Sequence, residues 1–486
     1  MSVRVRFAPS PTGFLHVGGL RTALYNYLFA RHHNGTFVLR IEDTDRTRLV
    51  ENAVENLIKS LHWAGIDYDE GPGRGGEYGP YIQSERLYIY TEYAVQLHQR
   101  GAAYYAFDTP EEIDEMRKRN PAESFTKYDR MLMKNELTLS NVEVMKLIEA
   151  GKTFVLRLKV PDSTTIVFDD LIRGKVEVTA NEIDDQVLMK SDGFPTYHFA
   201  NVVDDHLMKI THVIRGEEWL PSTPKHVILY DAFGWDKPLF AHLPLLLNPD
   251  KTKLSKRQGS AAVEDFASEG YFSDAFVNFI ALLGWNPSAD REIYSIDELI
   301  ESFDIEKVNK GGAVFDRAKL EWINFQYLKQ KPVSELTDIL APILEAKDIS
   351  GFNTEYIEKV IDLFRERIKL VKDIPEIAGY MFVPPQEYEP DYMEKYWKAN
   401  TIEILKPLLV QYKATDDFSH SALYELTKSY IEGLGMKLKE IIHPIRLMLT
   451  GKSAGAGMFE TMEVLGKDEC IKRIEEFIQK KELEGI

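Results

Sequence analysis

Two separated segments of the 486-residue sequence carry side chains suited to binding a nucleotide. The first, residues 9–19, reads Pro-Ser-Pro-Thr-Gly-Phe-Leu-His-Val-Gly-Gly and lies between an expected strand and an expected helix. Paired glycines at a helix start expose backbone N–H groups to an anion, and His16 could donate to a phosphate. Taken alone, the segment could equally be a glycine-rich turn with an ordinary surface histidine.

The second segment, residues 251–257, has four cations in seven residues and includes Lys-Leu-Ser-Lys-Arg from position 253. Turn-forming residues flank it, so we expect a loop. Lysines on such a loop can close over a triphosphate and neutralise the leaving group. No Gly-x-x-x-x-Gly-Lys-Ser/Thr motif occurs, which argues against a P-loop NTPase. Taken alone, this segment is better interpreted as a solvated basic loop.

The elements around these segments alternate between strand and helix. An extended run at 3–7, a helix with its apolar face between Leu20 and Leu28, and a strand at 37–41 predict a βαβ unit of a parallel sheet. The parallel-sheet pattern returns in 211–214 and 239–247, on either side of a predicted helix at 223–233. Between the two parts, the predicted strands 155–160 and 165–168 indicate a smaller α/β insertion. After Lys329 the periodicity is helical, in segments 336–344, 357–370, 423–434 and 469–478.

Composition restricts the class of protein. Hydrophobic residues at 44% and charged residues at 28% indicate an ordinary globular chain, neither disordered nor fibrous. A single cysteine, Cys470, excludes a disulfide framework and a multi-cysteine zinc cluster, and it fits a reducing cytoplasm. Residues 1–6 do not have the pattern of a secretory signal, and the densest apolar run, 239–247, is less than half a membrane span. We therefore expect a cytoplasmic protein with no membrane partner.

The net charge of −18 argues at first against a nucleic-acid partner, since phosphate binding requires basic surface. The acidic residues are unevenly distributed, however. Residues 1–60 contain eight basic and five acidic side chains, whereas 161–248 contain seven and 14, and 331–486 contain 21 and 28. The whole-chain charge therefore does not exclude local basic patches that bind RNA.

Taken together, the two segments resemble the two signatures of class I aminoacyl-tRNA synthetases. Arg-Ile-Glu-Asp-Thr-Asp-Arg at 40–46, Tyr-His-Phe-Ala-Asn-Val-Val-Asp-Asp at 197–205 and Val-Ile-Arg-Gly-Glu-Glu-Trp at 213–219 are similar to the glutamyl-tRNA synthetase branch, bacterial type. The resemblance covers essentially the whole chain. Gly19 stands where the general class signature has a second histidine, as is common in this branch. Bacterial relatives often bind zinc through cysteines in the insertion; residues 102–109 have none, so zinc is not expected and aromatic packing is expected to hold that region.

The resemblance implies ATP-dependent attachment of L-glutamate to tRNA(Glu) through a glutamyl adenylate, with release of AMP and diphosphate and with Mg²⁺ accompanying ATP. It implies three catalytic residues, His16, Lys253 and Lys256. The implied ATP-binding residues are Pro9, Thr12, His16, Gly18, Gly19, Lys253, Ser255, Lys256 and Arg257. The implied glutamate-binding residues are Arg6, Ala8, Ser10, Glu42, Tyr197, Asn201 and Arg215, and the implied pocket rim at the tRNA 3′ end is Glu218 and Trp219. No metal on the protein is implied.

Physical chemistry agrees with these roles but leaves alternatives. An anionic substrate side chain calls for arginine, whose fork binds a carboxylate bidentately, and Glu42 suits an α-ammonium. Without the resemblance, Glu42 would be better interpreted as part of a surface salt-bridge cluster, with about 0–1 kcal/mol per pair. Tyr197 and Trp219 could be core aromatics rather than pocket rim. The three histidines at 198, 206 and 212 fit no zinc spacing, and we expect structural roles for them.

The implied fold is α/β: a class I Rossmann-like parallel-sheet catalytic domain with an inserted α/β domain, followed by an all-α anticodon-binding region. The expected parts are 1–107 and 193–248 for the catalytic domain, 108–192 for the insertion, 249–330 for a stem-contact domain and 331–486 for the helical region, with two subdomains. The expected partners are tRNA(Glu), L-glutamate and ATP, and the expected state is a monomer.

Four rival functions deserve comparison with this one. Glutaminyl-tRNA synthetases have β-barrels where this chain has helical periodicity, and a truncated paralogue that glutamylates a modified tRNA base would be shorter. A catalytically inactive RNA-binding relative would not need His16 and the basic loop, and a small-metabolite nucleotidyltransferase would not need a helical anticodon reader. The sequence does not settle whether tRNA(Gln) is also charged, which residues read the anticodon, or whether activation requires bound tRNA.

Overall fold

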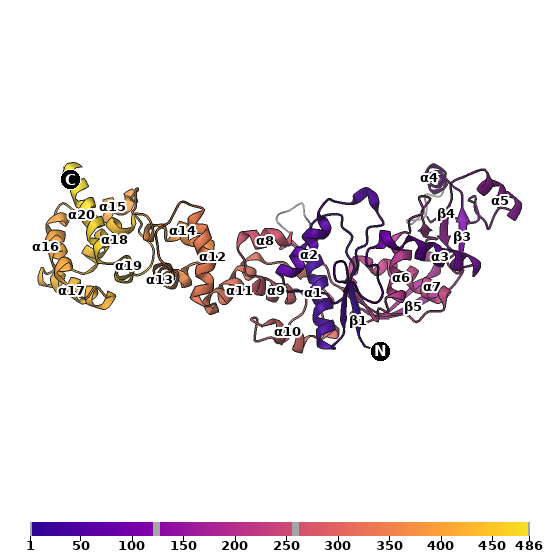
Figure 1. The fold of residues 1–486 in the computed structure, drawn as a ribbon, viewed down its shortest axis with the longest axis horizontal. Coiled ribbons are helices and arrows are strands. Elements are labelled where there is room, and N and C mark those ends of the chain that lie inside the picture. The colour runs from indigo at the N-terminus through magenta and orange to yellow at the C-terminus, as the bar shows by residue number, and fades with distance from the viewer. Residues whose placement is uncertain (1, 120–126, 255–261, 485–486) are drawn as a thin grey trace. The chain divides into compact units, whose positions relative to one another are not determined.

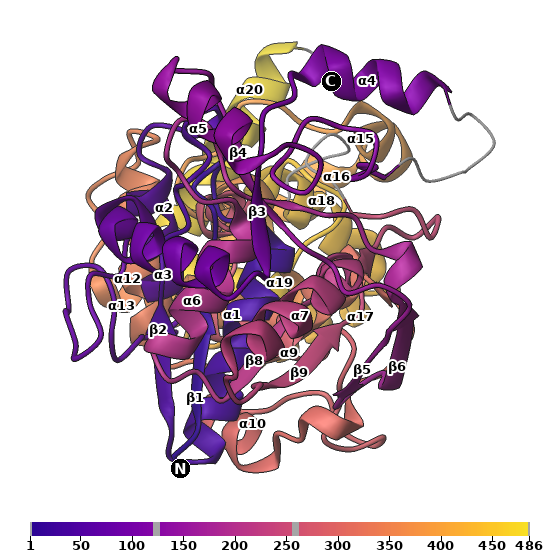
Figure 2. The same cartoon turned by 90° about the vertical axis from the view of Figure 1, so that its right-hand side faces the viewer.

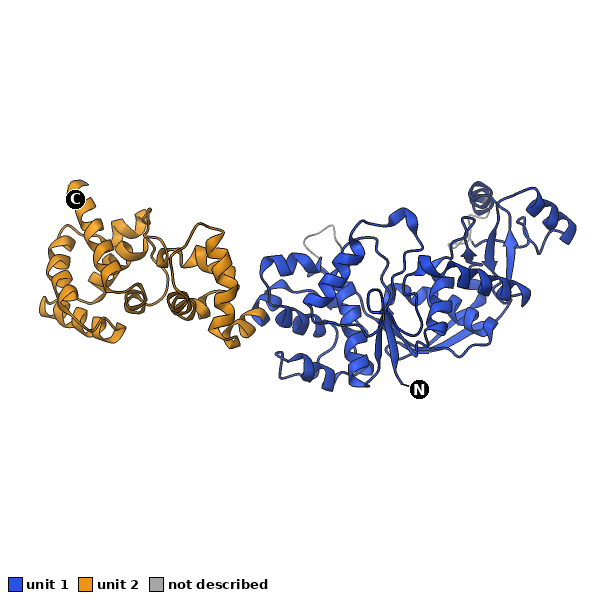
Figure 3. Ribbon diagram, viewed as in Figure 1, with its two compact units in different colours: residues 1–323 blue, residues 324–486 orange. Residues whose placement is uncertain are grey.

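The computed structural model describes residues 2–119, 127–254 and 262–484. The chain divides into two compact units, Met1–Ile323 and Asn324–Ile486 (Figure 3). The division falls within helix α11 (Arg317–Gln330), whose last residue coincides with the sequence-based boundary at 330/331.

The first unit contains the strands and ten complete helices of the described chain. Its strands are β1 (Arg4–Phe7), β2 (Thr36–Leu39), β3 (Ala103–Ala106), β4 (Val155–Leu158), β5 (Thr165–Asp170), β6 (Gly174–Thr179), β7 (Val187–Met189), β8 (His212–Gly216), β9 (Leu239–Leu243), β10 (Leu246–Leu247) and β11 (Ala313–Val314). Its helices are α1 (Val17–His32), α2 (Ala53–Trp63), α3 (Leu87–Gln99), α4 (Pro110–Arg119), α5 (Asn141–Glu149), α6 (Tyr197–Leu207), α7 (Thr223–Phe233), α8 (Val263–Glu269), α9 (Ser273–Ala281) and α10 (Ile296–Ser302).

A parallel arrangement of strands forms the centre of this unit. β1 pairs in parallel with β2, and β8 pairs in parallel with β9. The backbone N–H of Thr211 donates to the carbonyl oxygen of Arg4 at 2.9 Å, which places β8 beside β1. The order across the unit is therefore β2, β1, β8, β9, β5, β6. The connection after β1 leads to β2 and the connection after β8 leads to β9, so the two connections run in opposite directions along this strand order. Ligands bind open α/β sheets at the carboxyl ends of the strands at such a switch point.

The predicted strands are confirmed, but one of them lies in a different sheet from the expected one. The sequence assigned 165–168 to the small insertion, whereas β5 pairs in parallel with β9 through Asp170 and Phe240. β6 follows β5 as its antiparallel partner and ends the sheet, and β8, β9, β5 and β6 lie side by side in Figure 2. The hairpin β5–β6 therefore extends the catalytic sheet, because strand pairing depends on distant residues that local periodicity does not reveal.

The insertion has its own sheet, in the order β3-β4-β7, with both pairings antiparallel. Since β3 (Ala103–Ala106) belongs to this sheet, the expected boundary between residues 107 and 108 was placed too late in the sequence. Aromatic packing holds this region, as the sequence predicted. Tyr105 and Phe154 lie with ring centroids 5.0 Å apart, and the Arg157 guanidinium stacks 3.9 Å above the ring centroid of Tyr128. The hydroxyl of buried Tyr104 donates to Asp185 at 2.6 Å, so polar contacts add to the packing.

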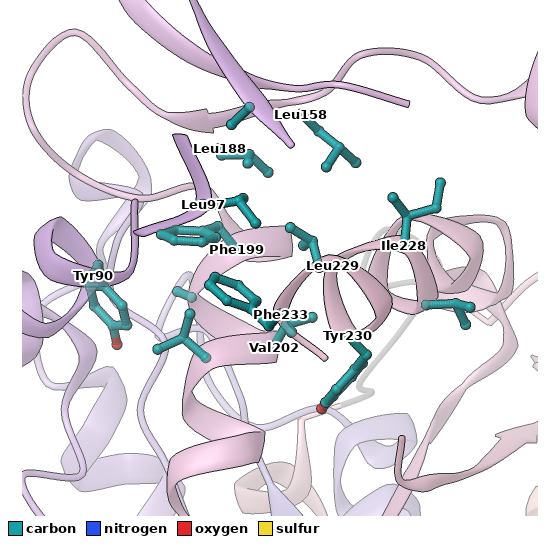
Figure 4. Packing of buried hydrophobic residues seen from close by; sticks show 14 of the residues in the cluster. Tyr90, Leu97, Leu158, Leu188, Phe199, Val202, Ile228, Leu229, Tyr230 and Phe233 are labelled. Atoms are coloured by element: carbon teal, nitrogen blue, oxygen red, sulfur yellow. The ribbon is translucent and has the colours of Figure 1, made fainter. Parts of the chain in front are cut away.

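A buried apolar cluster joins the insertion to the catalytic sheet. Figure 4 shows Phe199 and Val202 of α6 against Leu229 and Phe233 of α7, with Leu158 of β4 on the insertion side. Helix α7 occupies the residues predicted for it. Its start has proline in the first turn, and its end has Gly234 in the left-handed region at φ 68°, where glycine carries no side-chain penalty. These helices fix the end of the sheet that carries the site.

On the other side of β1, helices α8, α9 and α10 lie beside α1 and α2 (Figure 1). The short strands β10 and β11 pair in parallel and connect this group to the segment after β9. The second unit begins within α11, and among its described residues the regular secondary structure is helical, as predicted. Its helices are α12 (Val333–Glu345), α13 (Thr354–Phe364), α14 (Ile374–Ile377), α15 (Pro390–Tyr396), α16 (Thr401–Ala414), α17 (His420–Gly433), α18 (Lys439–Thr450), α19 (Met458–Leu465) and α20 (Lys467–Glu484).

Across residues 2–119, 127–254 and 262–484, none of these helices combines the length and the apolar character needed to cross a membrane.

Candidate active site

A pocket of about 350 Å³ lies at the carboxyl ends of β1 and β8. Its lining comes from segments that are far apart in the sequence: the loop after β1, the start of α1, the segment after β2, helix α6 and the end of β8. The expected site residues found in this lining are Arg6, Ala8, Pro9, Ser10, Thr12, His16, Gly18, Gly19, Glu42, Tyr197, Asn201, Arg215, Glu218 and Trp219. The fold therefore brings the expected glutamate-binding and rim residues and most of the ATP-binding residues into one cavity.

The start of α1 forms one side of the pocket. His16 is the N-cap of this 16-residue helix, and its Nδ1 accepts a hydrogen bond from the backbone N–H of Gly18 at 3.0 Å. An accepting Nδ1 places the proton of a neutral imidazole on Nε2, which is then a donor. At Gly19, an added Cβ would lie 2.9 Å from a side-chain carbon of Leu15. The small residues and the positive end of the helix dipole suit an anionic ligand here.

Two residues that line the pocket, Arg6 and Glu42, are paired with two buried residues outside its lining, Asp205 and Arg40. We call these four residues the paired wall. Arg6 contacts both carboxylate oxygens of Asp205, with Nε at 3.0 Å and Nη2 at 3.2 Å. Arg40 donates to Asp205 from Nη1 at 2.7 Å and to Glu42 from Nη2 at 2.9 Å. All four side chains are buried, so the alternative of a surface salt-bridge cluster is wrong for Glu42.

The pKa values of the paired wall follow from burial and from these contacts. Burial opposes ionisation of Asp205, but Arg6 and Arg40 outweigh it and lower its pKa. Burial likewise opposes the charge of Arg40, yet Asp205 and Glu42 raise its pKa well above the ordinary value. For Glu42, burial prevails over Arg40 and raises the pKa. Glu42 is thus the member of the wall whose charge is least stabilised and would gain most from a further cation.

Helix α6 supplies this wall through residues one turn apart. Asn201 and Asp205 are separated by four positions and share a face; Asn201 Nδ2 donates to Glu42 Oε1 at 3.2 Å. The adjacent Asp204 accepts from Arg86 at 2.8 Å and from Tyr90 at 2.8 Å, and it also lies 3.7 Å from Arg40 Nε. Both aspartates therefore contact Arg40, but only Asp205 also pairs with Arg6.

The lining residue Arg215 lies among uncharged groups: Tyr197, which also lines the pocket, and Thr223, His226 and His242 behind the lining. We call these five residues the neutral wall. Arg215 Nε donates to His242 Nε2 at 3.1 Å, Nη1 to the Tyr197 hydroxyl at 2.9 Å, and Nη2 to the Thr223 hydroxyl at 2.9 Å. Longer contacts reach His226 Nδ1 and the carbonyl oxygen of Trp219, each at 3.4 Å. Arg215 itself is 5% exposed.

The groups around Arg215 are neutral for physical reasons. Burial, followed by the charge of Arg215, lowers the pKa of His226 well below its ordinary value. Burial lowers the pKa of His242 to about 4 against the opposing effect of Asp170, and burial raises the pKa of Tyr197. Among the residues that the structure describes, the hydrogen-bond partners of Arg215 thus leave its charge uncompensated, whereas Arg6 is paired with a carboxylate.

Two aromatic residues bound the entrance. The rings of Tyr197 and Trp219 lie with centroids 4.2 Å apart at an interplanar angle of 36°. Trp219 is 38% exposed and Glu218 is exposed, both on the turn Glu217–Ser222, while Tyr197 is half-buried and lines the cavity. The pocket position, rather than the core, is therefore correct for both aromatics.

The three histidines that we expected to be structural have packing contacts. His198 Nδ1 lies 3.2 Å from His226 Nε2, and burial lowers its pKa to about 3. His206 stacks on Trp235 with centroids 3.7 Å apart, and His212 packs against Phe29. Within the described residues, no group of three or more His, Cys, Asp or Glu side chains is arranged to hold a metal ion.

The expected residues of the basic loop are the part of the site that the pocket lining does not contain. Lys253 is exposed and follows β10, where its backbone forms an antiparallel bridge with Leu247. Ser255, Lys256 and Arg257 lie outside the described residues.

The sequence analysis missed five residues of the two walls: Arg40, Asp205, Thr223, His226 and His242. Arg40 and Asp205 belong to quoted motifs, and the spacing of Asp205 from Asn201 was an available signal. For His242, the available signal was a polar residue within the apolar run 239–247. A larger cavity of about 840 Å³ in the insertion is lined by residues from 108–116, 127–134, 160–162 and 180–185, and none of the expected site residues lines it.

Comparison with known proteins adds to this geometry. Residues 2–322 match the family model described as "tRNA synthetases class I (E and Q), catalytic domain", and residues 335–478 match "Anticodon binding domain". The glutamate–tRNA ligase of Chloroherpeton thalassium is 50% identical, over 99% of this chain and 98% of its own. That of Chlorobaculum parvum is 49% identical, over 98% of each chain.

Solved structures of glutamate–tRNA ligases show the same similarity. The crystal structure of a glutamate tRNA ligase from Elizabethkingia meningosepticum, in complex with its amino acid, has a TM-score of 0.94 at 43% identity and covers 99% of both chains. The glutamate–tRNA synthetase from Elizabethkingia anophelis has a TM-score of 0.92 at 42% identity, covering 99% of this chain and 100% of that one.

Proposed function

The chain belongs to the class I glutamate–tRNA ligases, and we propose that the pocket between the paired and neutral walls is where it joins L-glutamate to tRNA(Glu) in an ATP-dependent reaction. The observation that carries this assignment is the uncompensated Arg215 opposite Glu42 in a single cavity. A cation on one wall and a carboxylate on the other match an amino acid whose side chain is anionic and whose backbone carries an ammonium group.

Glutamate is proposed to lie across the pocket. Arg215 binds the side-chain carboxylate, and the neutral Tyr197 hydroxyl adds a hydrogen bond. Arg6 contributes from the other side with its charge offset by Asp205, and Glu42 binds the α-ammonium, with Asn201 holding Glu42 in place. Ala8 and Ser10, on the loop after β1, complete the contacts of the amino acid.

ATP is proposed to lie at the start of α1. Its phosphates face His16 and the N–H groups near Gly18 and Gly19, with Pro9 and Thr12 beside the nucleotide. Lys253, Ser255, Lys256 and Arg257 approach from the basic loop, an assignment that rests on the sequence motif. Mg²⁺ is proposed to enter with ATP as the counter-ion of its phosphate oxygens.

The reaction needs no general base in its first step, because the attacking α-carboxylate is already an anion. Its oxygen attacks the α-phosphorus in line, the bond to the bridging oxygen breaks, and diphosphate leaves with the negative charge. His16, Lys253 and Lys256 stabilise that charge. A ribose hydroxyl at the tRNA 3′ end, the 2′-OH in class I, then takes the glutamyl group and AMP leaves. Glu218 and Trp219 at the entrance are placed to meet that end.

Lys256 is proposed to act on the transition state more than on bound ATP. Lys256→Ala is therefore expected to reduce glutamate-dependent exchange of diphosphate into ATP by about 100-fold or more while ATP affinity changes by only a few-fold. Equal exchange rates in the variant and the wild type would remove Lys256 from the mechanism.

The function is tested by charging purified tRNA(Glu) and tRNA(Gln) with L-glutamate and with L-glutamine, and by measuring diphosphate exchange with and without tRNA. We expect glutamate to be attached to tRNA(Glu). Attachment of glutamine would instead indicate the glutaminyl activity that the matched catalytic family also includes. The tRNA(Gln) arm shows whether both tRNAs are charged, and the exchange arms show whether activation needs tRNA.

The helical second unit is proposed to bind the anticodon, in keeping with the family model that it matches. We further propose that the enzyme acts as a monomer, because residues of one chain suffice to line the pocket. A cytoplasmic location is proposed as well, since a single cysteine fits a reducing compartment.

A further inference from the structure

Arg215 is the end of a row of three polar side chains that crosses the sheet. Arg215 on β8 and His242 on β9 are register partners, and Asp170 is the last residue of β5, which pairs with β9 (Figure 2). His242 Nδ1 lies 2.6 Å from Asp170 Oδ2, and His242 Nε2 lies 3.1 Å from Arg215 Nε. Asp170 is 3% exposed and His242 is fully buried.

The contacts at both ends fix the tautomer of His242. Asp170 accepts backbone N–H bonds from Ile172 at 3.0 Å and Arg173 at 2.8 Å, which hold it as a carboxylate. A carboxylate accepts only, so the imidazole proton lies on Nδ1. The single lone pair of Nε2 then receives the Nε–H of Arg215. The hydroxyl proton of Thr223, 3.1 Å from the same Nε2, has an alternative acceptor in the carbonyl oxygen of Trp219 at 3.3 Å.

The imidazole between the two charges has an electrostatic consequence. A carboxylate in direct contact with Arg215 would orient the guanidinium but would also neutralise it, as Asp205 does for Arg6. A neutral imidazole orients the guanidinium through one hydrogen bond and leaves its charge for a ligand. The low pKa of His242, about 4, keeps the imidazole neutral near pH 7.

We propose that Asp170 and His242 are positioning residues that hold Arg215 oriented and charged for the side-chain carboxylate of glutamate, and that they thereby set the preference for glutamate over its amide, glutamine. The proposal rests on the proposed function, in which Arg215 binds that carboxylate. Neither residue touches the substrate: both act through Arg215.

Asp170→Asn tests the tautomer directly. The asparagine can keep its oxygen toward the backbone N–H groups of Ile172 and Arg173, and its NH₂ then faces His242 Nδ1. That arrangement moves the imidazole proton to Nε2, where it opposes the Nε–H of Arg215. We expect the KM for glutamate to rise about 10- to 100-fold and the selectivity against glutamine to fall by a similar factor, while the KM for ATP changes less than threefold.

His242→Gln separates positioning from a merely structural role. Its amide oxygen can accept from Arg215 Nε, but the buried Asp170 loses the imidazole N–H. We therefore expect His242→Gln to lose more stability than Asp170→Asn but to raise the KM for glutamate less. His212→Gln, on strand β8 with Arg215 but outside the pocket, is the matched control, with the KM values for glutamate and ATP near wild type.

The outcomes distinguish the two proposals. If Arg215→Met raises the KM for glutamate and neither Asp170→Asn nor His242→Gln does, the positioning proposal is overturned and the proposed function stands. The positioning proposal is also overturned if the KM values for glutamate and ATP rise together and rise most in the variant that has lost the most stability. If Arg215→Met itself leaves the KM for glutamate unchanged, the failure lies in the proposed function. If Asp170→Asn does not fold, the selectivity for glutamate over glutamine is compared between His242→Gln and His212→Gln. A lower selectivity in His242→Gln supports the proposal, and equal selectivities overturn it.

Discussion

The two walls of the pocket use arginine in opposite ways. In the paired wall, Arg6 and Arg40 contact the carboxylates of Asp205 and Glu42 and their charges are offset within the protein. In the neutral wall, Arg215 is held by hydroxyls, a carbonyl oxygen and two neutral imidazoles. A buried arginine with ionic partners organises the pocket, whereas one held by neutral acceptors keeps its charge for the ligand.

The difference also separates stability from binding. Removing one member of a buried ion-pair network leaves an uncompensated charge, which costs more than losing the contact itself. Removing a cation that has only neutral partners leaves hydroxyls and imidazoles, which are less costly to bury. Substitutions on the paired wall should therefore act mainly on folding, and those around Arg215 mainly on glutamate.

The largest effect on stability is expected for Arg40→Met. The change leaves Glu42, Asp204 and Asp205 without the guanidinium that they share, so the free energy of unfolding should fall by about 3–5 kcal/mol in urea titrations. Arg31→Met, which breaks the partly exposed pair with Asp69, is the control, with an expected loss of at most about 1 kcal/mol. Equal losses in the two variants would contradict the structural role given to the paired wall.

A smaller effect, on pH dependence, is expected for Glu42→Gln. Burial raises the pKa of Glu42, so the folded protein binds this proton more tightly than the unfolded chain. The resulting stabilisation is fully present below the ordinary value of 4.5 and is lost as pH rises through the raised pKa. Relative to Glu42→Gln, the wild type should therefore lose stability with rising pH, by at most about 1.4 kcal/mol per pH unit.

Saturating L-glutamate sharpens this measurement. Its ammonium group favours the ionised form of Glu42, so the ligand should reduce the pH slope of the wild type and leave that of Glu42→Gln unchanged. Urea midpoints measured from pH 4.5 upward, with and without glutamate, give both slopes. Identical slopes for the two proteins would show that Glu42 does not titrate as described.

Local signals in the sequence were sufficient for much of the fold and for most residues of the pocket. The helix at 223–233 was predicted at its exact bounds, because its proline and the following glycine act within a few residues. Motifs placed Arg6, Glu42, Tyr197 and Arg215 in one site, and the pocket contains all four.

The parts of the fold and of the pocket that the sequence did not predict depend on pairing between distant segments. The contact of His242 with Arg215 follows from the parallel register of β8 and β9, and its contact with Asp170 requires β5 to join the same sheet. Periodicity near residues 165–168 shows a strand but not its partner, which is why that strand was assigned to the insertion. Likewise, the rotation of α6 about its axis decides whether Asp204 or Asp205 contacts Arg6. Two consecutive aspartates in the sequence do not indicate which of them makes this contact.

The most direct test of the account is the affinity for L-glutamate of Arg215→Met beside Arg6→Met, measured as the KM in the charging of tRNA(Glu) together with the urea midpoint of each protein. The account predicts a rise of about 100-fold or more in the KM for Arg215→Met with the smaller loss of stability, because a charge-assisted contact with the ligand is removed. Arg6→Met should show the smaller rise in KM and the larger loss of stability. A KM for Arg215→Met within about threefold of wild type would contradict the claim that its uncompensated charge selects glutamate.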